Sequence, residues 1–213
     1  MKLRGNAPTP SIELPGLGPW PLPGEPRRAA RDDRTGWPVG PAAPLLAGAT
    51  WICFPEGEVA PPGERPAYEF VATLTLEAAP DAATLAATAH GVYEAFVNGV
   101  RVGDAELTPG TSAYHSTLYV QTHDVARLLR AGANEVRLVL SDGWFRGQGG
   151  FSRVADHAGT RTAVVARLAG EAAGEPFVLV TDPSWRVAVG AITAADLMEG
   201  EVHDLRRLGH EDW

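Results

Sequence analysis

The 213-residue sequence contains a single cysteine, Cys53, and this scarcity limits the chemistry open to the chain. One thiol can form no disulfide within the chain, and metal sites built from several thiolates are excluded. Because Cys53 stands between Ile52 and Phe54, we expect it to be a small buried apolar residue.

Long apolar runs and clusters of basic residues are also missing. No stretch of about 18 consecutive apolar residues occurs, so no membrane-spanning helix is predicted. The opening residues lack the apolar core of a signal peptide, which favours a cytoplasmic location. The formal net charge is −8 and no basic run is longer than two arginines, so nucleic-acid binding, which needs a clustered cationic face, is disfavoured.

The common patterns of metal and catalytic sites are absent as well. The six histidines form no HxH or HExxH motif, and no serine lies in a GxSxG context. Glu199, Glu201 and Asp204 form a carboxylate cluster of the kind that glycoside hydrolysis uses. Their close spacing is more typical of caps and of partners for Arg206 and Arg207. We therefore predict no catalytic residue and no metal site in this chain.

Turn-forming residues, in contrast, are abundant, with 24 glycines and 18 prolines. Ten of the prolines lie in residues 1–50, and proline at this density prevents a long helix or a central strand. We interpret residues 1–50 as an extended arm anchored by Trp20, Trp37 and Leu45–Leu46, or else as a partly disordered leader. The folded domain is expected over residues 51–213.

A β-hairpin gives the clearest structural signal. Val92–Val97 has the alternation of a short strand, and the Asn98-Gly99 pair that follows readily adopts the positive φ angles of a two-residue turn. Val100–Val102 is therefore predicted to return antiparallel to the first strand.

One short helix and several further strands are expected from residue periodicity. Asp124 can cap the helix, in which Val125, Leu128 and Leu129 repeat at helical spacing and which Gly132 can end. Further strands are predicted at Tyr68–Leu76, Thr84–Thr88, Thr117–Gln121, Asn134–Leu140, Thr162–Leu168, Phe177–Val180 and Trp185–Val189. This pattern predicts an all-β fold, a two-sheet sandwich of the jelly-roll, galactose-binding-like kind with one short helix.

Three blocks within residues 68–208 resemble successive parts of the N-terminal β-sandwich region of bacterial α-L-rhamnosidases. They read VYEAFVNGVRVGD, LTPGTSAYHSTLYVQTHDVARLLRAGANEVRLVLSDGWFRG and TDPSWRVAVGAITAADLMEGEVHDLRRL. Where that family has a Gly-Glu-Tyr-Asp type motif, this chain has Val202-His203 in place of the usual pair. The resemblance implies a non-catalytic role, because the catalytic acids of the family lie in a downstream helical barrel that this chain does not contain.

The resemblance leaves two functions open. In the first, the chain is an accessory module that binds a rhamnose-containing glycan, or shapes the substrate cleft of an enzyme that hydrolyses terminal α-L-rhamnose. In the second, it is a structural module without sugar affinity, which docks on the missing catalytic domain through exposed apolar surface. Some sugar-binding modules related to the family depend on calcium, so the resemblance alone permits a calcium cofactor.

The aromatic, glycine-rich loop Asp142–Phe151 holds the first candidates for sugar contact. Sugar rings stack their C–H faces on aromatic planes, and their hydroxyls bond to carboxylate and guanidinium groups. Trp144, Asp142 and Arg146 supply all three kinds of group. The alternative is that Trp144 and Phe145 plug the end of the sandwich while Asp142 and Arg146 tie the loop together.

Asp104 and Tyr114 are two further candidates for sugar contact. With Glu106 and Thr108 they line a predicted loop over Asp104–Ser116. Its oxygen atoms are of the type that holds a hard cation, but the spacing is not that of an EF-hand, so no metal ligand is assigned here.

Overall fold

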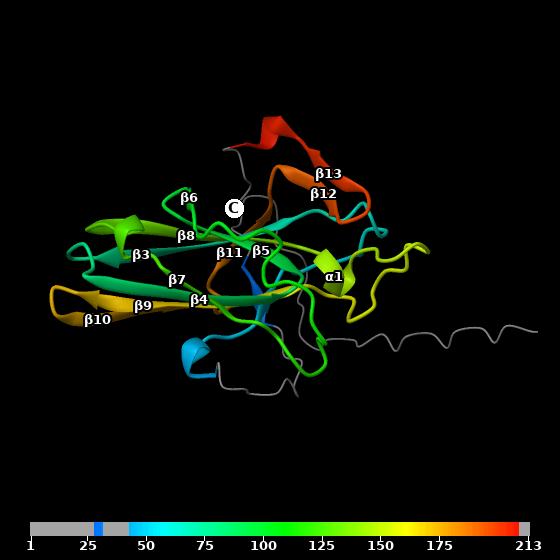
Figure 1. Cartoon of the computed structure of the whole chain (residues 1–213). Helices are drawn as coiled ribbons and strands as arrows, with labels where there is room; N and C mark the ends of the chain where they lie inside the picture. The colour runs from blue at the N-terminus through cyan, green and yellow to red at the C-terminus, as the bar shows by residue number, and fades with distance from the viewer. Residues whose placement is uncertain (1–27, 32–42, 209–213) are drawn as a thin grey trace, which may run out of the picture.

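The computed structural model describes residues 28–31 and 43–208, which form a two-layer antiparallel β-sandwich (Figure 1). The first layer has the strand order β1 (Ala30–Arg31), β2 (Ile52–Cys53), β9 (Ala163–Ala172), β4 (Ala82–His90) and β7 (Gln121–Asp124), with β10 (Glu175–Val180) also paired to β9. The second has the order β11 (Arg186–Val189), β3 (Tyr68–Leu76), β8 (Gly132–Ser141), β5 (Val92–Val97) and β6 (Val100–Arg101). A separate hairpin, β12 (Ile192–Asp196) with β13 (Gly200–His203), lies above the second layer. The predicted all-β two-sheet sandwich is confirmed, while its jelly-roll order stays a prediction.

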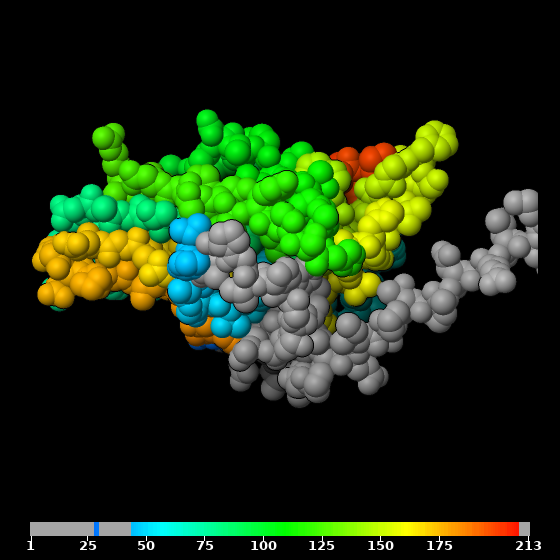
Figure 2. Space-filling model, turned by 60° about the horizontal axis from the view of Figure 1, so that its bottom comes forward, coloured from blue at the N-terminus to red at the C-terminus, as the bar shows by residue number. Residues whose placement is uncertain are grey.

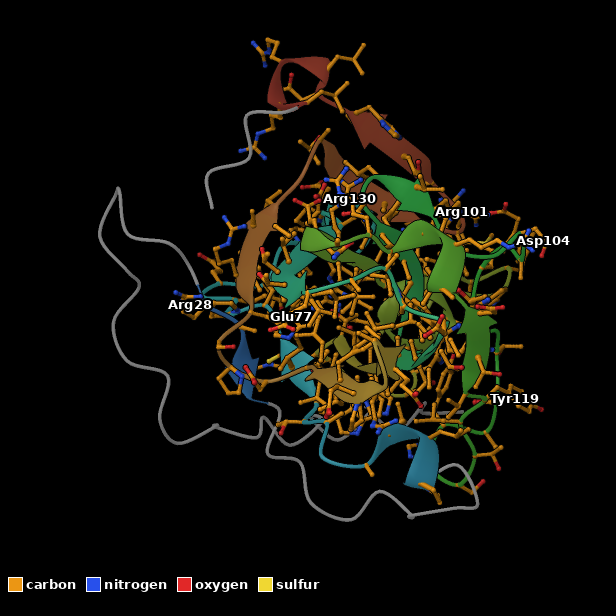
Figure 3. The ribbon with its side chains drawn as sticks, turned by 90° about the vertical axis from the view of Figure 1, so that its left-hand side faces the viewer. Arg28, Glu77, Arg101, Asp104, Tyr119 and Arg130 are labelled. Atoms are coloured by element: carbon orange, nitrogen blue, oxygen red, sulfur yellow. The ribbon has the colours of Figure 1, made fainter. Side chains whose placement is uncertain are left out.

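The two layers pack through side chains that alternate along their strands, and these fill the space between the sheets (Figure 3). Phe70 of β3 lies opposite Leu138 of β8 in the register, and both side chains are fully buried. The facing strand β4 contributes small residues such as Ala87 and Ala89, which are also buried. The small side chains on one layer leave room for the larger ones on the other, and the two sets together form the core.

The predicted hairpin at Asn98-Gly99 is confirmed. Val97 pairs with Val100, and both turn residues have positive φ, 52° and 79°. The Asn98 side chain also bonds across the sheet: its Nδ2 donates to Asn134 Oδ1 at 2.9 Å, and its Oδ1 accepts from the backbone N–H of Glu135 at 3.0 Å. Asn98 therefore fixes the end of β8 as well as the turn.

The strand and the helix predicted near residue 120 are displaced. The strand expected at Thr117–Gln121 is β7, which begins at Gln121, where pairing with β4 starts. The expected helix is a single 3₁₀ turn, η2 (Ala126–Leu128), whose Ala126 N–H donates to Asp124 Oδ1 at 3.0 Å. Leu129 is already extended, so the turn ends well before Gly132 and no α-helix forms.

The α-helix of the described residues lies elsewhere, in a segment predicted as loop. It is α1 (Gly143–Arg146), a single turn directly after β8. Gly143 has φ 51°, and a Cβ at this position would lie 2.6 Å from Val92 Cγ1, so the turn requires glycine. The hairpin β12–β13 was also not predicted, because its sequence has no clean alternation.

Gly91 alone connects β4 of the first layer to β5 of the second. Its φ is 140°, and a Cβ there would lie 2.3 Å from the Ser141 carbonyl oxygen. The chain therefore crosses between the layers in one residue, beside the end of β8 from which α1 starts.

Parts of the proline-rich segment lie on the sandwich. Strand β1 pairs with β2. The 3₁₀ turn η1 (Ala43–Leu46) lies between them in the sequence, with Leu45 exposed and Leu46 half-buried. The anchors expected at Trp20 and Trp37 lie outside the described residues, and the domain boundary at residue 50 stays a prediction.

Candidate functional site

The helix α1 and the segments around it form one end of the sandwich, which we call the loop end (Figure 1). It consists of residues 54–67, residues 142–162, which include α1, and residues 196–199 at the turn between β12 and β13. These segments are far apart in the sequence, and buried ion pairs and hydrogen bonds join them.

Arg146, on α1, has a fully buried side chain at the centre of the loop end. Its Nε donates to Asp142 Oδ1 at 2.6 Å. Its Nη1 donates to both carboxylate oxygens of Glu56, at 2.7 and 2.8 Å, and to the carbonyl oxygen of Thr160 at 3.3 Å. One guanidinium group therefore ties α1 to the loops on both sides of it.

Arg65 is a second buried arginine in the same network. Its Nη1 donates to Asp142 Oδ2 at 3.2 Å, to the Arg146 carbonyl oxygen at 3.2 Å and to Asp156 Oδ1 at 2.9 Å, while its Nε donates to the Ala60 carbonyl oxygen at 2.9 Å. Asp142 is thus held by two guanidinium groups. Buried charges persist only when they are paired in this way, so the network fixes the relative positions of the loops.

The pKa values of Asp142, Arg146 and Tyr68 are shifted at the loop end. Burial raises the pKa of the Asp142 carboxyl, and the neighbouring charges of Arg146 and Arg65 oppose that rise. Burial lowers the pKa of Arg146, but the charges of Asp142 and Glu56 outweigh it and raise that pKa above its usual range, so this guanidinium stays charged. The Tyr68 phenol donates to Glu56, and burial together with the Glu56 charge raises the pKa of Tyr68.

Aromatic rings line the inner side of α1. The His90 ring stacks between Trp51 and Phe145, with ring centroids 4.2 and 4.8 Å away. Tyr114 meets the Phe145 ring edge-on at 5.2 Å. These rings hold α1 against the end of β4 and bring Tyr114 of the 104–116 loop to the same place.

Asp196, at the end of β12, connects the hairpin β12–β13 to the loop end. Its Oδ2 accepts from the backbone N–H of Gln148 at 2.9 Å, and its Oδ1 accepts from those of Met198 and Glu199 at 2.8 and 3.3 Å. Since its carboxylate is buried, these three donors fix the turn of the hairpin against the loop that follows α1.

The structure brings four of the five predicted site residues together. Asp142 and Arg146 are buried and bonded to each other, Tyr114 is buried against Phe145, and Trp144 is half-buried on α1. Asp104 lies elsewhere.

Asp104 is exposed and points outward near Arg101 (Figure 3). Arg101 pairs with Phe96, four residues along β5 from Val92, the residue against which Gly143 of α1 packs. At the rise of a β-strand this separation is roughly 13 Å. Asp104 is therefore not part of the loop end.

Four residues of the loop end were not predicted from the sequence: Glu56, Arg65, Asp156 and Asp196. Arg65 stands in a Pro/Gly-rich segment, where an isolated charged residue gives no periodic signal. The other three are single carboxylates in loops or at a strand end, and only their partners in space distinguish them from solvated surface residues.

Within residues 28–31 and 43–208, no group of three or more histidine, cysteine, aspartate or glutamate side chains is arranged to hold a metal ion. Over the same residues, no helix has the length and apolar character needed to cross a membrane.

Residues 78–213 match the family described as Alpha-L-rhamnosidase N-terminal domain. An α-L-rhamnosidase of Streptomyces avermitilis is 36% identical over 179 residues, which cover 82% of this chain and 16% of that enzyme. An α-L-rhamnosidase of Formosa agariphila is 26% identical over 124 residues, which cover 57% of this chain and 13% of that protein. The chain thus spans only a small part of the length of its curated relatives.

Solved structures agree with this relationship. The crystal structure of Streptomyces avermitilis α-L-rhamnosidase complexed with L-rhamnose aligns with a TM-score of 0.64 and 37% identity, over 67% of this chain and 14% of that one. Native α-L-rhamnosidase from Aspergillus terreus aligns with a TM-score of 0.72 and 26% identity, over 79% of this chain and 19% of that one. The chain therefore belongs to the family of α-L-rhamnosidase N-terminal domains.

Proposed function

We propose that this chain is a non-catalytic accessory domain of an enzyme that hydrolyses terminal α-L-rhamnose, and that Trp144 contacts a rhamnose-containing glycan at the loop end. The observation that carries the proposal is that Trp144 on α1 is half-buried and keeps some exposed surface, while its neighbours Phe145 and Arg146 are fully buried. An aromatic ring on a fixed helix is preorganised, so little ordering entropy is lost when a sugar stacks on it.

In this proposal Asp142 and Arg146 are positioning residues. Their side chains are buried, and Asp142 is bonded to both buried arginines, so neither faces an incoming sugar. Tyr114 supports Phe145 in the same way. The ligand contact then depends on one partly exposed indole, so we expect weak binding, with Kd on the order of millimolar to micromolar.

The test is a titration of the chain with L-rhamnose, followed by tryptophan fluorescence and by NMR shifts, with and without added calcium. We expect a saturable response that the Trp144→Ala variant loses. Tyr119→Ala, which removes an exposed aromatic ring from a different loop, is the control and is expected to respond as the wild type does. If the Trp144→Ala variant still responds to L-rhamnose, the sugar binds at another place on the chain.

A docking role without sugar affinity is the second candidate. Phe151, on the loop that follows α1, is fully exposed and has further exposed apolar residues on neighbouring segments, and this favours docking because contiguous apolar surface marks protein interfaces. Absence of any response to L-rhamnose in the titration above would favour docking over glycan contact.

A further inference from the structure

Four exposed apolar residues gather on the loop end, and we call them the apolar tip. Phe151 is fully exposed, and Val154, Met198 and Val59 are 51%, 44% and 42% exposed. The segment that contains Phe151 and Val154 stands out from the body of the molecule at the end where α1 lies (Figure 2). Single exposed apolar residues are common on protein surfaces, but four on neighbouring segments are not.

Specific contacts place these segments side by side. Gly149 and Val154 exchange two backbone hydrogen bonds, of 2.9 and 3.2 Å, which close the turn that presents Phe151. Arg153 of the same turn forms an ion pair with Glu199, the neighbour of Met198. A Cβ on Gly63 would lie 2.8 Å from Gln148 Nε2 and 3.1 Å from Glu199 Cγ, so the segment that carries Val59 borders the other two.

Hydrogen bonds of Asp156 and Asp196 hold the segments of the apolar tip in place. Asp156, just after the turn, is bonded to Arg65, and its backbone N–H donates to the Arg146 carbonyl oxygen at 2.9 Å. Asp196 fixes both Gln148 and Met198. An exposed aromatic side chain beside apolar and charged ones is typical of protein-binding surfaces, and a surface held by such contacts loses little entropy when a partner covers it.

We propose that the apolar tip is the surface on which the remainder of an α-L-rhamnosidase polypeptide docks, a proposal that rests on the accessory-domain role above. The chain spans 16% of its Streptomyces avermitilis relative, and the matching family is described as an N-terminal domain, so in such an enzyme the rest of the polypeptide follows this region.

Exposed apolar residues also continue from the apolar tip toward residue 208, the last residue that the structure describes. Beyond Met198 they run along the C-terminal hairpin and the 3₁₀ turn η3 (Leu205–Arg207), through Val202, Leu205 and Leu208, which are all exposed. A glycan is a poor occupant for the apolar tip, since valine and methionine side chains offer no hydrogen bonds to sugar hydroxyls. The partner surface is expected to be an apolar pocket for Phe151, with polar groups around it that meet Arg153 and Glu199.

The lone cysteine makes a direct test practicable, because Cys53 is buried and a new surface thiol can be followed separately by mass spectrometry. Val154→Cys, which keeps Phe151 in the apolar tip, is prepared in the chain alone and in a chimera where the chain replaces the aligned segment of the Streptomyces avermitilis enzyme. Val178→Cys is the matched control, since Val178 is 54% exposed on β10, a strand on the side of the sandwich away from α1 (Figure 1). Labelling by a maleimide is timed without any sugar present.

We expect labelling at position 154 to be at least about tenfold slower in the chimera than in the chain alone, because docking buries the tip, and labelling at position 178 to be unchanged. Equal rates at position 154 in both proteins overturn the proposal, and so does equal slowing at both positions. Slowing in the chain alone as its concentration rises would instead identify a second copy as the occupant. Since no sugar is used, this result is independent of the L-rhamnose titration, which tests glycan contact in the chain alone.

Discussion

Arg146 Nη1 lies 2.7 and 2.8 Å from the two carboxylate oxygens of Glu56, a residue 90 positions earlier in the chain. This contact closes the loop end, because Glu56 precedes β3 whereas Arg146 follows β8. Both side chains are buried, so removing either one would leave the charge of the other buried without this partner.

Replacing Arg146 by methionine is expected to lower the free energy of unfolding by about 3–5 kcal/mol, because Asp142 and Glu56 would be left buried with a partner missing. Urea denaturation followed by circular dichroism measures the loss. Arg206→Met is the control, since Arg206 pairs with Asp204 on the open surface and its loss should hardly move the midpoint. Equal effects of the two substitutions would show that the buried network does not stabilise the fold.

The Tyr68 phenol is expected to ionise at a lower pH in the Glu56→Gln variant than in the wild type. Burial and the Glu56 charge raise the pKa of Tyr68, and the substitution removes the second cause. Since the folded-state pKa is raised, its contribution to stability is complete below the unfolded value of about 10 and is lost as the pH rises through the folded-state pKa. Phenolate absorbance followed in an alkaline titration measures the shift, and Tyr68→Phe identifies the transition that belongs to this residue. An unchanged transition would exclude Glu56 as a cause.

Substitutions at Asn98 separate its backbone role from its side-chain role. Asn98→Gly keeps the positive φ but removes the hydrogen bond to the buried Asn134 side chain. We therefore expect the free energy of unfolding to fall by about 1–3 kcal/mol. Asn98→Ala should lose about a further 1 kcal/mol, because alanine is strained at φ 52°. Thermal and urea unfolding of the two variants and the wild type measure these differences in stability. If the glycine variant is as stable as the wild type, the turn conformation alone explains the asparagine.

Asp196→Ala is expected to loosen the contact between the hairpin β12–β13 and the loop after α1. The backbone N–H groups of Gln148 and Met198 lose their carboxylate acceptor, so their hydrogen exchange should quicken, and a trypsin-like protease should cut faster after Arg153. Asp124→Ala is the control, because Asp124 accepts from Ala126 and should alter exchange there and not at Gln148. Unchanged exchange at Gln148 in the Asp196 variant would contradict the assigned role.

Local patterns in the sequence were enough to predict the strands with regular alternation and the hairpin. The strand Tyr68–Leu76 has the predicted bounds, because one of its faces is apolar along its whole length. Strand β4 extends beyond its predicted Thr84–Thr88, since its alanines carry little periodic signal and pairing with β9 sets its length. Helix α1 could not be predicted, because a single turn that begins at a glycine lacks the capping and spacing signals of a longer helix.

The residues of the loop end were only partly predictable for a related reason. Asp142 directly precedes α1 and Arg146 ends it, so the two are only four residues apart, and a tie between them could be considered from the sequence. Glu56 and Arg65 reach the same place from a distant segment, and only the sandwich brings them there. Sequence spacing carries no information about such contacts. The sequence therefore left two interpretations of Asp142 and Arg146 open, sugar contact and a tie within the loop, and their hydrogen bond of 2.6 Å shows the tie.

The single-residue link at Gly91 limits how chain length can vary in this fold. An added residue there would shift the register of β5 by one and turn Tyr93, Ala95 and Val97 from the core toward solvent. The turn at Ala173-Gly174 between β9 and β10 has open space beside its glycine and no such restriction. Peptide tags and natural length variation are therefore tolerable between β9 and β10, whereas the crossing beside α1 must keep its length for the sandwich to form.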